Sequence, residues 1–192
     1  MYIVIAPIPE DLAAAVQPYR QRYDPLVKAL PPHITVLNPF EFLDSPEILY
    51  KHLTEIGENH APIKTSIAGW DIYHQIDYQL RLPVIAGRVE LTELREDLLT
   101  GPLKYCPGQD KDYWPHIHLG QFTTEAEVIE LKKIMSGFEP QFIFRVTQLE
   151  LLRWDKPGYP WMLEKHFGLE ATLMGSGRKK ETRTSSSSNL IL

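Results

Sequence analysis

The chain has 192 residues, 43% hydrophobic and 23% charged, as in an ordinary globular protein. Its net charge of −5 argues against a broad basic surface for duplex DNA or long RNA, although a small phosphate ester in a local pocket is not excluded. The single cysteine, Cys106, excludes an intramolecular disulfide, and no apolar run suits a signal peptide or a membrane span. We therefore expect a cytoplasmic protein that does not associate with membranes.

The first half of the chain alternates strand and helix signals. The expected elements are residues 1–6 (strand), 9–26 (helix), 33–37 (strand), 45–56 (helix), 63–73 (strand) and 76–82 (strand). Pro18 lies inside the first helical pattern and is expected to kink or divide it. Ser45 and Pro46 have the form of an N-cap followed by a proline at the first helical position. The last strand alternates apolar and polar residues, which predicts one buried face and one polar face. The apolar residues are Ile76, Tyr78, Leu80 and Leu82, and the polar residues between them are Asp77, Gln79 and Arg81.

The second half repeats this order. The expected elements are residues 91–98 (helix), 116–121 (strand), 124–135 (helix), 142–154 (strand) and 161–169 (strand). After the first strand, each half thus reads helix, strand, helix, strand, strand, which indicates a duplicated α+β unit with an approximate twofold axis. We expect one domain over residues 1–170, with lobes of roughly 1–85 and 86–170 that may exchange strands. Residues 171–192 are rich in Gly, Ser and charge and are expected to form a flexible tail.

One motif occurs once in each half, on the same element of the repeat. It reads "PPHITVLNPF" at residues 31–40 and "YWPHIHLGQF" at residues 113–122. Side chains alternate along a strand, so His33 shares a face with Thr35, and His116 shares a face with His118. A twofold axis would bring the two strands together, and the four polar side chains would then face one ligand.

Two imidazoles that titrate near neutrality form a natural acid–base pair. The neutral one takes a proton from water, and the protonated one gives a proton to a leaving alkoxide. Thr35 and His118, one step along each strand, can donate hydrogen bonds to a phosphoryl oxygen. This combination suits phosphodiester chemistry without a metal or another cofactor.

The two motifs "PHIT" and "PHIH", one per half of a duplicated chain, resemble the 2H phosphoesterase superfamily, the group similar to 2′-5′ RNA ligases. The resemblance implies a bilobal, internally duplicated α+β fold, with antiparallel sheets lining a central cleft and helices packed outside. It implies hydrolysis of 2′,3′-cyclic phosphates or 2′-5′ linkages in small nucleotides or RNA ends, and in some members RNA ligation. His33 and His116 match the catalytic histidines and Thr35 the first hydroxyl, whereas His118 stands where the family has threonine or serine.

Two other readings remain open. The His-x-His pair could chelate a metal such as zinc, with Asp110 or Asp112 just upstream, or the chain could be a nucleotide-binding module without activity. Further candidates for substrate contact are Tyr159, Arg153 and Trp154, around the turn "DKPGYP" at residues 155–160. The expected partner is a small nucleotide or an RNA-end phosphodiester, and the protein is expected to be a monomer.

Overall fold

The computed structural model of the chain describes residues 1–109, 112–157 and 159–171; the expected tail at residues 171–192 lies outside this range except for its first residue. The strands are β1 (Tyr2–Pro7), β2 (His33–Phe40), β3 (Ile63–Ala68), β4 (Asp71–His74), β5 (Tyr78–Pro83), β6 (His116–Phe122), β7 (Gln141–Val146), β8 (Gln148–Arg153) and β9 (Met162–Gly168). The helices are α1 (Glu10–Tyr23), α2 (Pro46–Asn59), α3 (Arg88–Leu98) and α4 (Glu125–Met135), and a 3₁₀ turn spans Gly101–Leu103. The fold is therefore α+β, as the sequence predicts.

Seven strands form one antiparallel sheet in the order β4-β5-β6-β2-β1-β8-β9, and β3 pairs with β7 in a second sheet. This order exposes the repeat, because β1-α1-β2-α2-β3-β4 corresponds to β5-α3-β6-α4-β7-β8. When each element is replaced by its counterpart in the other repeat, the strands β4-β5-β6 correspond to β8-β1-β2. Strand β9 has no counterpart in the first repeat. The repeat thus starts at β1 and at β5, and not after the first strand as the sequence pattern indicates.

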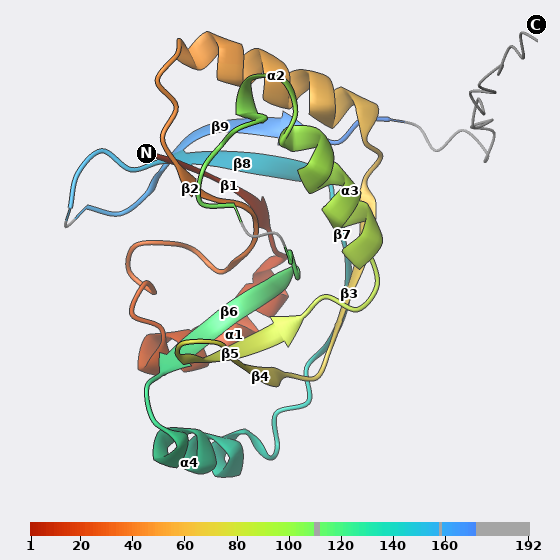
Figure 1. Cartoon of the computed structure of the whole chain (residues 1–192). Helices are drawn as coiled ribbons and strands as arrows, with labels where there is room; N and C mark the ends of the chain where they lie inside the picture. The colour runs from red at the N-terminus through yellow and green to blue at the C-terminus, as the bar shows by residue number, and fades with distance from the viewer. Residues whose placement is uncertain (110–111, 158, 172–192) are drawn as a thin grey trace, which may run out of the picture.

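The first helix of each repeat packs on the motif strand of the other repeat. Helix α1 contacts β6, whereas α3 contacts β2 and α2. In Figure 1, α2 and α3 lie beside the β1–β2–β8–β9 part of the structure, and α1 and α4 lie beside β4–β5–β6. Each group of elements therefore contains segments from both halves of the sequence.

Two strands that the sequence pattern predicts as continuous are each divided between the two sheets. The expected strand 63–73 is β3 followed by β4, and the expected strand 142–154 is β7 followed by β8. Gly69 separates the first pair with φ of +73°, a left-handed conformation that glycine adopts at little cost. β-branched and aromatic residues signal extended backbone but do not signal the sheet that it joins, so the pattern could not show either division.

Two smaller expectations also differ from the structure. Helix α1 is continuous from Glu10 to Tyr23, so Pro18 does not divide it. Leu12 and Val16 before the proline and Arg20 after it are buried, and they hold both parts of the helix against the rest of the structure. Ile76 lies in the turn before β5 and is 89% exposed, so it does not belong to the apolar face of that strand. Arg81, expected on the polar face, is buried.

Several local signals are confirmed. Helix α2 has Ser45 as its N-cap residue and proline at the first position, although the serine side chain bonds Glu47 and not a backbone N–H of the helix. Helix α4 begins with a complete capping box between Thr124 and Glu127. Among the residues that the structure describes, no helix is long and apolar enough to cross a membrane.

The core lies on the faces of the large sheet that the helices cover. Ile34, Val36, Ile117 and Leu119 are fully buried, as expected for the residues between the polar positions of the two motifs. Burial of a large aliphatic side chain contributes about 1.5–3 kcal/mol. These four residues therefore fix the face of β2 and β6 that their polar neighbours occupy.

Gly120 allows α1 to approach β6 closely, and its replacement tests this contact. A Cβ at this position would lie 2.5 Å from Cβ of Tyr23 and 3.1 Å from its carbonyl oxygen. We expect Gly120→Ala to lower the free energy of unfolding by about 1–3 kcal/mol, the usual cost of overpacking, measured by urea denaturation. The control is Gly137→Ala, because nothing lies within 4 Å of that added Cβ. Equal stability of the two variants would contradict the close contact.

Candidate active site

The two motif strands meet at the middle residue of each motif. Strands β2 and β6 are antiparallel, and their register pairs Ile34 with Ile117. In an antiparallel register, the residue before one member faces the residue after the other, so His33 is directed toward His118 and Thr35 toward His116. The approximate twofold axis of the repeat passes through this bridge, and the four polar side chains lie on one face around it.

The neighbouring strands support the two motifs with the same register. Pro7 at the end of β1 is paired with His33, and Pro83 at the end of β5 is paired with His116. Ile5 then lies opposite Thr35, and Arg81 lies opposite His118. The site is therefore symmetric in its backbone, and its differences are confined to the side chains.

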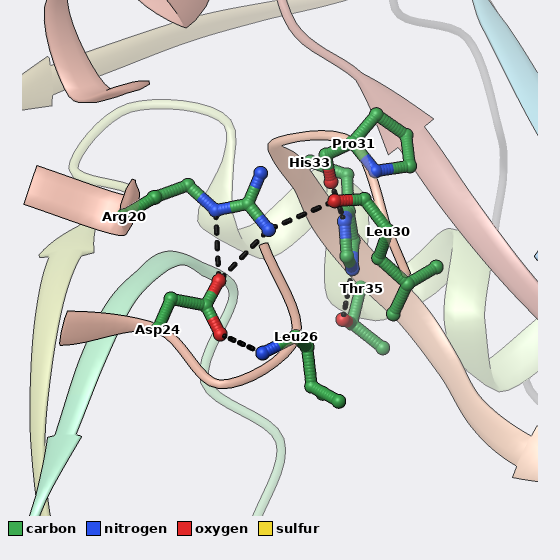
Figure 2. A network of polar contacts seen from close by, with 7 residues as sticks. All are labelled: Arg20, Asp24, Leu26, Leu30, Pro31, His33 and Thr35. Carbon is green, nitrogen blue, oxygen red and sulfur yellow. Dashed lines mark hydrogen bonds and ion pairs between the residues drawn. The ribbon is translucent and has the colours of Figure 1, made fainter. Parts of the chain in front are cut away.

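Each motif histidine is fixed by the backbone carbonyl two residues before it. Nδ1 of His33 lies 2.6 Å from the Pro31 oxygen, and Nδ1 of His116 lies 2.7 Å from the Trp114 oxygen. A carbonyl oxygen can only accept, so Nδ1 of each ring must carry the proton. In a neutral ring Nε2 is then unprotonated and can take a proton from another group. Figure 2 shows this arrangement for His33.

The residues two positions further along the strands differ. The Thr35 hydroxyl lies 3.0 Å from Nε2 of His33 and donates to it when that ring is neutral. His118 occupies the matching position in β6, partly buried like the other three polar residues. Its ring makes no hydrogen bond to any of the described residues. The structure therefore has a hydroxyl on one strand of the pair and a third imidazole on the other.

An arginine–aspartate pair accompanies each half of the site. Arg20 and Asp24, both on or next to α1, form an ion pair of 2.8 Å close to His33. Arg81 on β5 binds Asp71 of β4 with two bonds of 2.9 Å, and this pair acts on His116. The sequence reasoning did not find these four residues, because an i,i+4 pair on a helix and a cross-strand pair usually lie on the surface.

Burial lowers the pKa of both motif histidines to about 4. The bonds to the Pro31 and Trp114 oxygens raise the pKa values but do not offset the burial. Positive charge on Arg20 and Arg81 lowers them further. Burial likewise lowers the pKa of His118, Asp24 acts against this, and the two arginines reinforce it. In the free protein the two motif imidazoles are therefore neutral at pH 7, and a nearby anion would raise their pKa values and favour the protonated form.

Two aromatic residues before His116 complete the surroundings. The Tyr113 hydroxyl donates to the Thr35 carbonyl at 2.8 Å and so joins the two motifs. Trp114 is 47% exposed, and the guanidinium of Arg88 lies 4.2 Å from the centroid of its ring. The sequence reasoning missed both residues, although they are part of the quoted motif "YWPHIHLGQF".

The structure places Arg153, Trp154 and Tyr159 away from the histidines. Arg153 is paired with Tyr2, at the other end of β1 from Pro7, which faces His33. Five residues of strand at roughly 3.3 Å each separate these levels by about 16 Å. Arg153 forms ion pairs with Asp155 and Glu164, and Trp154 donates through Nε1 to the backbone carbonyl of Tyr159. The three residues form a hairpin of their own and do not join the four motif side chains.

The structure brings no third ligand to the His-x-His pair within its described part. In residues 1–109, 112–157 and 159–171 no group of three or more His, Cys, Asp or Glu side chains is arranged to hold a metal ion. Asp110, one of the two acidic residues upstream of the pair, lies outside the described residues, whereas Asp112 is exposed.

The fold and the site define a class of protein: a duplicated α+β chain whose two paired central strands carry a His-x-Thr motif and a matching His-x-His motif. A family model described as the 2′-5′ RNA ligase superfamily matches residues 8–158. The chain belongs to this superfamily, and the resemblance to 2H phosphoesterases is confirmed.

Curated relatives agree with this assignment. A protein of Halalkalibacterium halodurans, named as a candidate phosphoesterase, is 33% identical over 114 residues, which are 58% of this chain and 63% of that protein. A protein of Geobacillus kaustophilus with the same description is 29% identical over 152 residues, 78% of this chain and 85% of its own length. The chain thus spans less than two thirds of the length of the first of these relatives.

Solved structures show the same fold. A Thermus thermophilus protein has a TM-score of 0.56 at 21% identity, over 88% of this chain and 97% of that protein. Escherichia coli LigT in complex with 3′-AMP has a TM-score of 0.55 at 15% identity, over 88% and 98% of the two chains. The α+β fold that the resemblance to 2H phosphoesterases implies is therefore confirmed.

The lowered histidine pKa values predict that stability depends on pH. Between pH 6.5, the ordinary pKa, and about 4 the unfolded chain binds protons that folded His33 and His116 do not bind. The free energy of unfolding should therefore fall as the pH drops through this window. We expect His33→Asn and His116→Asn to flatten the fall, measured by urea denaturation at pH 7.5, 6.5, 5.5 and 4.5.

The control for this series is His74→Asn, because His74 is exposed and stacked on Tyr78 at a ring distance of 4.0 Å. This variant should keep the pH dependence of the wild type. If the two motif variants also kept it, the lowered pKa values would be wrong.

Proposed function

We propose that the protein is a phosphoesterase that hydrolyses a small nucleotide or RNA-end phosphodiester, a 2′,3′-cyclic phosphate or a 2′-5′ linkage, by two-histidine acid–base catalysis without a metal. The observation that carries the proposal is the matched pair of histidines, each with Nδ1–H held by a carbonyl and Nε2 left for proton transfer. Family membership and the phosphoesterase names of the relatives agree with it.

For a 2′,3′-cyclic phosphate the reaction proceeds as an addition of water. One neutral imidazole takes a proton from water at Nε2 while the water oxygen bonds to phosphorus. The bond from phosphorus to one ribose oxygen breaks, and that oxygen takes a proton from the second, protonated imidazole. The product is a ribose phosphomonoester, and the proton on the first ring is returned to solvent to restore the starting state.

The electrostatics of the site support this sequence. Both motif histidines are neutral at pH 7 in the free protein, so one must gain a proton when the substrate binds. The negative phosphoryl group supplies the reason, because a nearby anion raises the pKa of an imidazole. The Thr35 hydroxyl, which donates to Nε2 of His33 in the free protein, is then available to bind a phosphoryl oxygen instead.

Two observations favour a nucleotide as the substrate. Structures of LigT with the same fold were determined with 3′-AMP and with NADP⁺. In this chain Trp114 is exposed beside His116, and an aromatic ring next to a phosphate site can stack on a base. Joining of RNA ends would require the same pair of histidines to catalyse the reverse of this cleavage.

The proposal predicts turnover that depends on both histidines and not on a metal. We expect His33→Ala and His116→Ala each to lower kcat by about 10²–10⁴, the usual worth of a general acid or base. The double variant should lose less than the product of the two factors, because the residues act as a unit. Thr35→Ala should lose less than either. The assay uses a panel of 2′,3′-cyclic nucleotides and 2′-5′ oligoadenylates, with and without EDTA.

Two results would decide against the proposal. Activity that disappears with EDTA and returns with zinc or manganese would favour the metal reading of the His-x-His pair. Tight binding of 3′-AMP without turnover of any compound in the panel would favour a binding module. His60→Ala is the matched control, because His60 pairs with Asp97 and contacts neither motif.

We further propose that His118 binds the phosphoryl group in place of the hydroxyl that the family has there. A protonated imidazole forms a charge-assisted hydrogen bond, which is stronger than the bond from threonine. Burial, Arg20 and Arg81 lower the pKa of His118 in the free protein, and an anionic ligand would raise it. The affinity of the site for an anion should therefore weaken as the pH rises. Because the pKa of His118 is lowered in the free protein, this weakening should begin below neutral pH.

The His118 proposal is tested by steady-state kinetics from pH 5.5 to 8.5. We expect His118→Ala to raise KM more than it lowers kcat, because the lost contact serves the ground state and the transition state alike. His118→Thr should keep measurable turnover and flatten the pH dependence of KM. A loss of kcat in His118→Thr as large as in His116→Ala would instead make His118 a direct participant or a metal ligand.

A further inference from the structure

A buried ion pair lies next to His33 and takes no part in the proposed reaction. Arg20 is 2% exposed and Asp24 is 6% exposed. The guanidinium binds Asp24 through Nε at 2.9 Å and through Nη2 at 2.8 Å, and the other carboxylate oxygen accepts from the Leu26 N–H at 2.8 Å. Figure 2 shows that these contacts tie the end of α1 to the segment that leads to β2.

The buried pair of Arg20 and Asp24 is expected to add little to the stability of the fold. Two charges lose their hydration on burial, and their mutual attraction often does no more than offset that loss. In addition, Nη1 of Arg20 is buried and has no hydrogen-bond partner among the described residues. An unsatisfied buried donor costs about 1–3 kcal/mol. A role in geometry explains the pair better than a role in stability.

The hydrogen bonds of Arg20 connect it to the segment that holds His33. Nη2 of Arg20 donates to the Leu30 carbonyl at 2.9 Å, and the next residue, Pro31, provides the carbonyl that holds Nδ1 of His33 at 2.6 Å. Pro31 and Pro32 have fixed φ angles, so the segment between Leu30 and His33 has little freedom of its own. Once Arg20 fixes Leu30, the position of the Pro31 oxygen is largely determined.

The second half of the chain uses a related contact at the same place. The first helix of that repeat, α3, carries the buried Arg95, whose guanidinium lies 4.8 Å from the centroid of the Tyr113 ring. Tyr113 stands three residues before His116, as Leu30 stands three residues before His33. In both halves an arginine from the first helix thus holds the residue that precedes the anchoring carbonyl.

We propose that Arg20, held by Asp24, is a positioning residue: it fixes Leu30 and Pro31 so that the Pro31 carbonyl keeps His33 in one tautomer and one orientation. Its loss would free the segment before β2, and Nε2 of His33 would no longer point to one place. The histidine of the other half keeps its own anchor on the Trp114 carbonyl, so the loss of the Pro31 anchor should affect the ring of His33 and not that of His116. The kinetic part of this inference depends on the proposed function, and the structural part does not.

The test is ¹⁵N NMR of the histidine rings at pH 7 in the full chain. The wild type should show His33 and His116 each as a single tautomer with Nδ1 protonated and Nε2 unprotonated. In Arg20→Gln we expect the His33 ring to become a mixture of tautomers while the His116 signals stay unchanged. Asp24→Asn should give a smaller change in the tautomers of the His33 ring, in the same direction. This variant replaces Arg20→Gln in the test if Arg20→Gln does not fold. The control is Lys51→Gln, which removes an exposed i,i+4 pair with Glu55.

If the wild type turns over a substrate, steady-state kinetics provide a second, independent test. We expect Arg20→Gln to lower kcat by about 10–100-fold with a smaller change in KM, because a misplaced catalytic group costs rate more than binding. Arg20→Lys, which keeps the charge but not the planar fork, should not restore the rate. Arg20→Gln with wild-type His33 ring signals would overturn the inference. A wild type without turnover would refute the proposed function alone, since the ring signals still report on the anchor.

Discussion

The whole arrangement depends on the contact between β2 and β6 at Ile34 and Ile117. This bridge sets the register between the two motif strands, and the approximate twofold axis of the repeat passes through it. Because both isoleucines are fully buried, the alternation of a strand places the polar residues of both motifs on the opposite face. A shift of one residue on either strand would turn two of the four polar side chains into the core.

The helices secure this bridge by crossing between the repeats. Helix α1 packs on β6 and α3 packs on β2, so each motif strand is supported by a helix from the other repeat. The Tyr113 hydroxyl adds a polar contact across the axis by donating to the Thr35 carbonyl. Neither half therefore supports its motif alone, and the spacing of the two histidines is a property of the complete domain.

The symmetry of the backbone contrasts with the asymmetry of the side chains. Carbonyls at matching positions hold Nδ1 of both histidines, and prolines at matching positions end the strands beside them. Around this common frame the first histidine has a hydroxyl and the Arg20–Asp24 pair, and the second has His118 and the Arg81–Asp71 pair. Such differences give two similar imidazoles different surroundings, which the proposed acid–base catalysis with distinct roles would require.

The sequence by itself determined the alternation of helices and strands, the presence of a repeat and the four motif positions, because periodicity, capping residues and a doubled "PHI" motif are local signals. It did not determine which sheet each strand joins, so the divisions at Gly69 and between β7 and β8 were missed. Only the tertiary structure decided that Arg20, Asp24 and Arg81 are buried beside the histidines and that Arg153 and Trp154 are remote from them. Charged residues carry no local sign of burial, since their environment is set by segments distant in the chain.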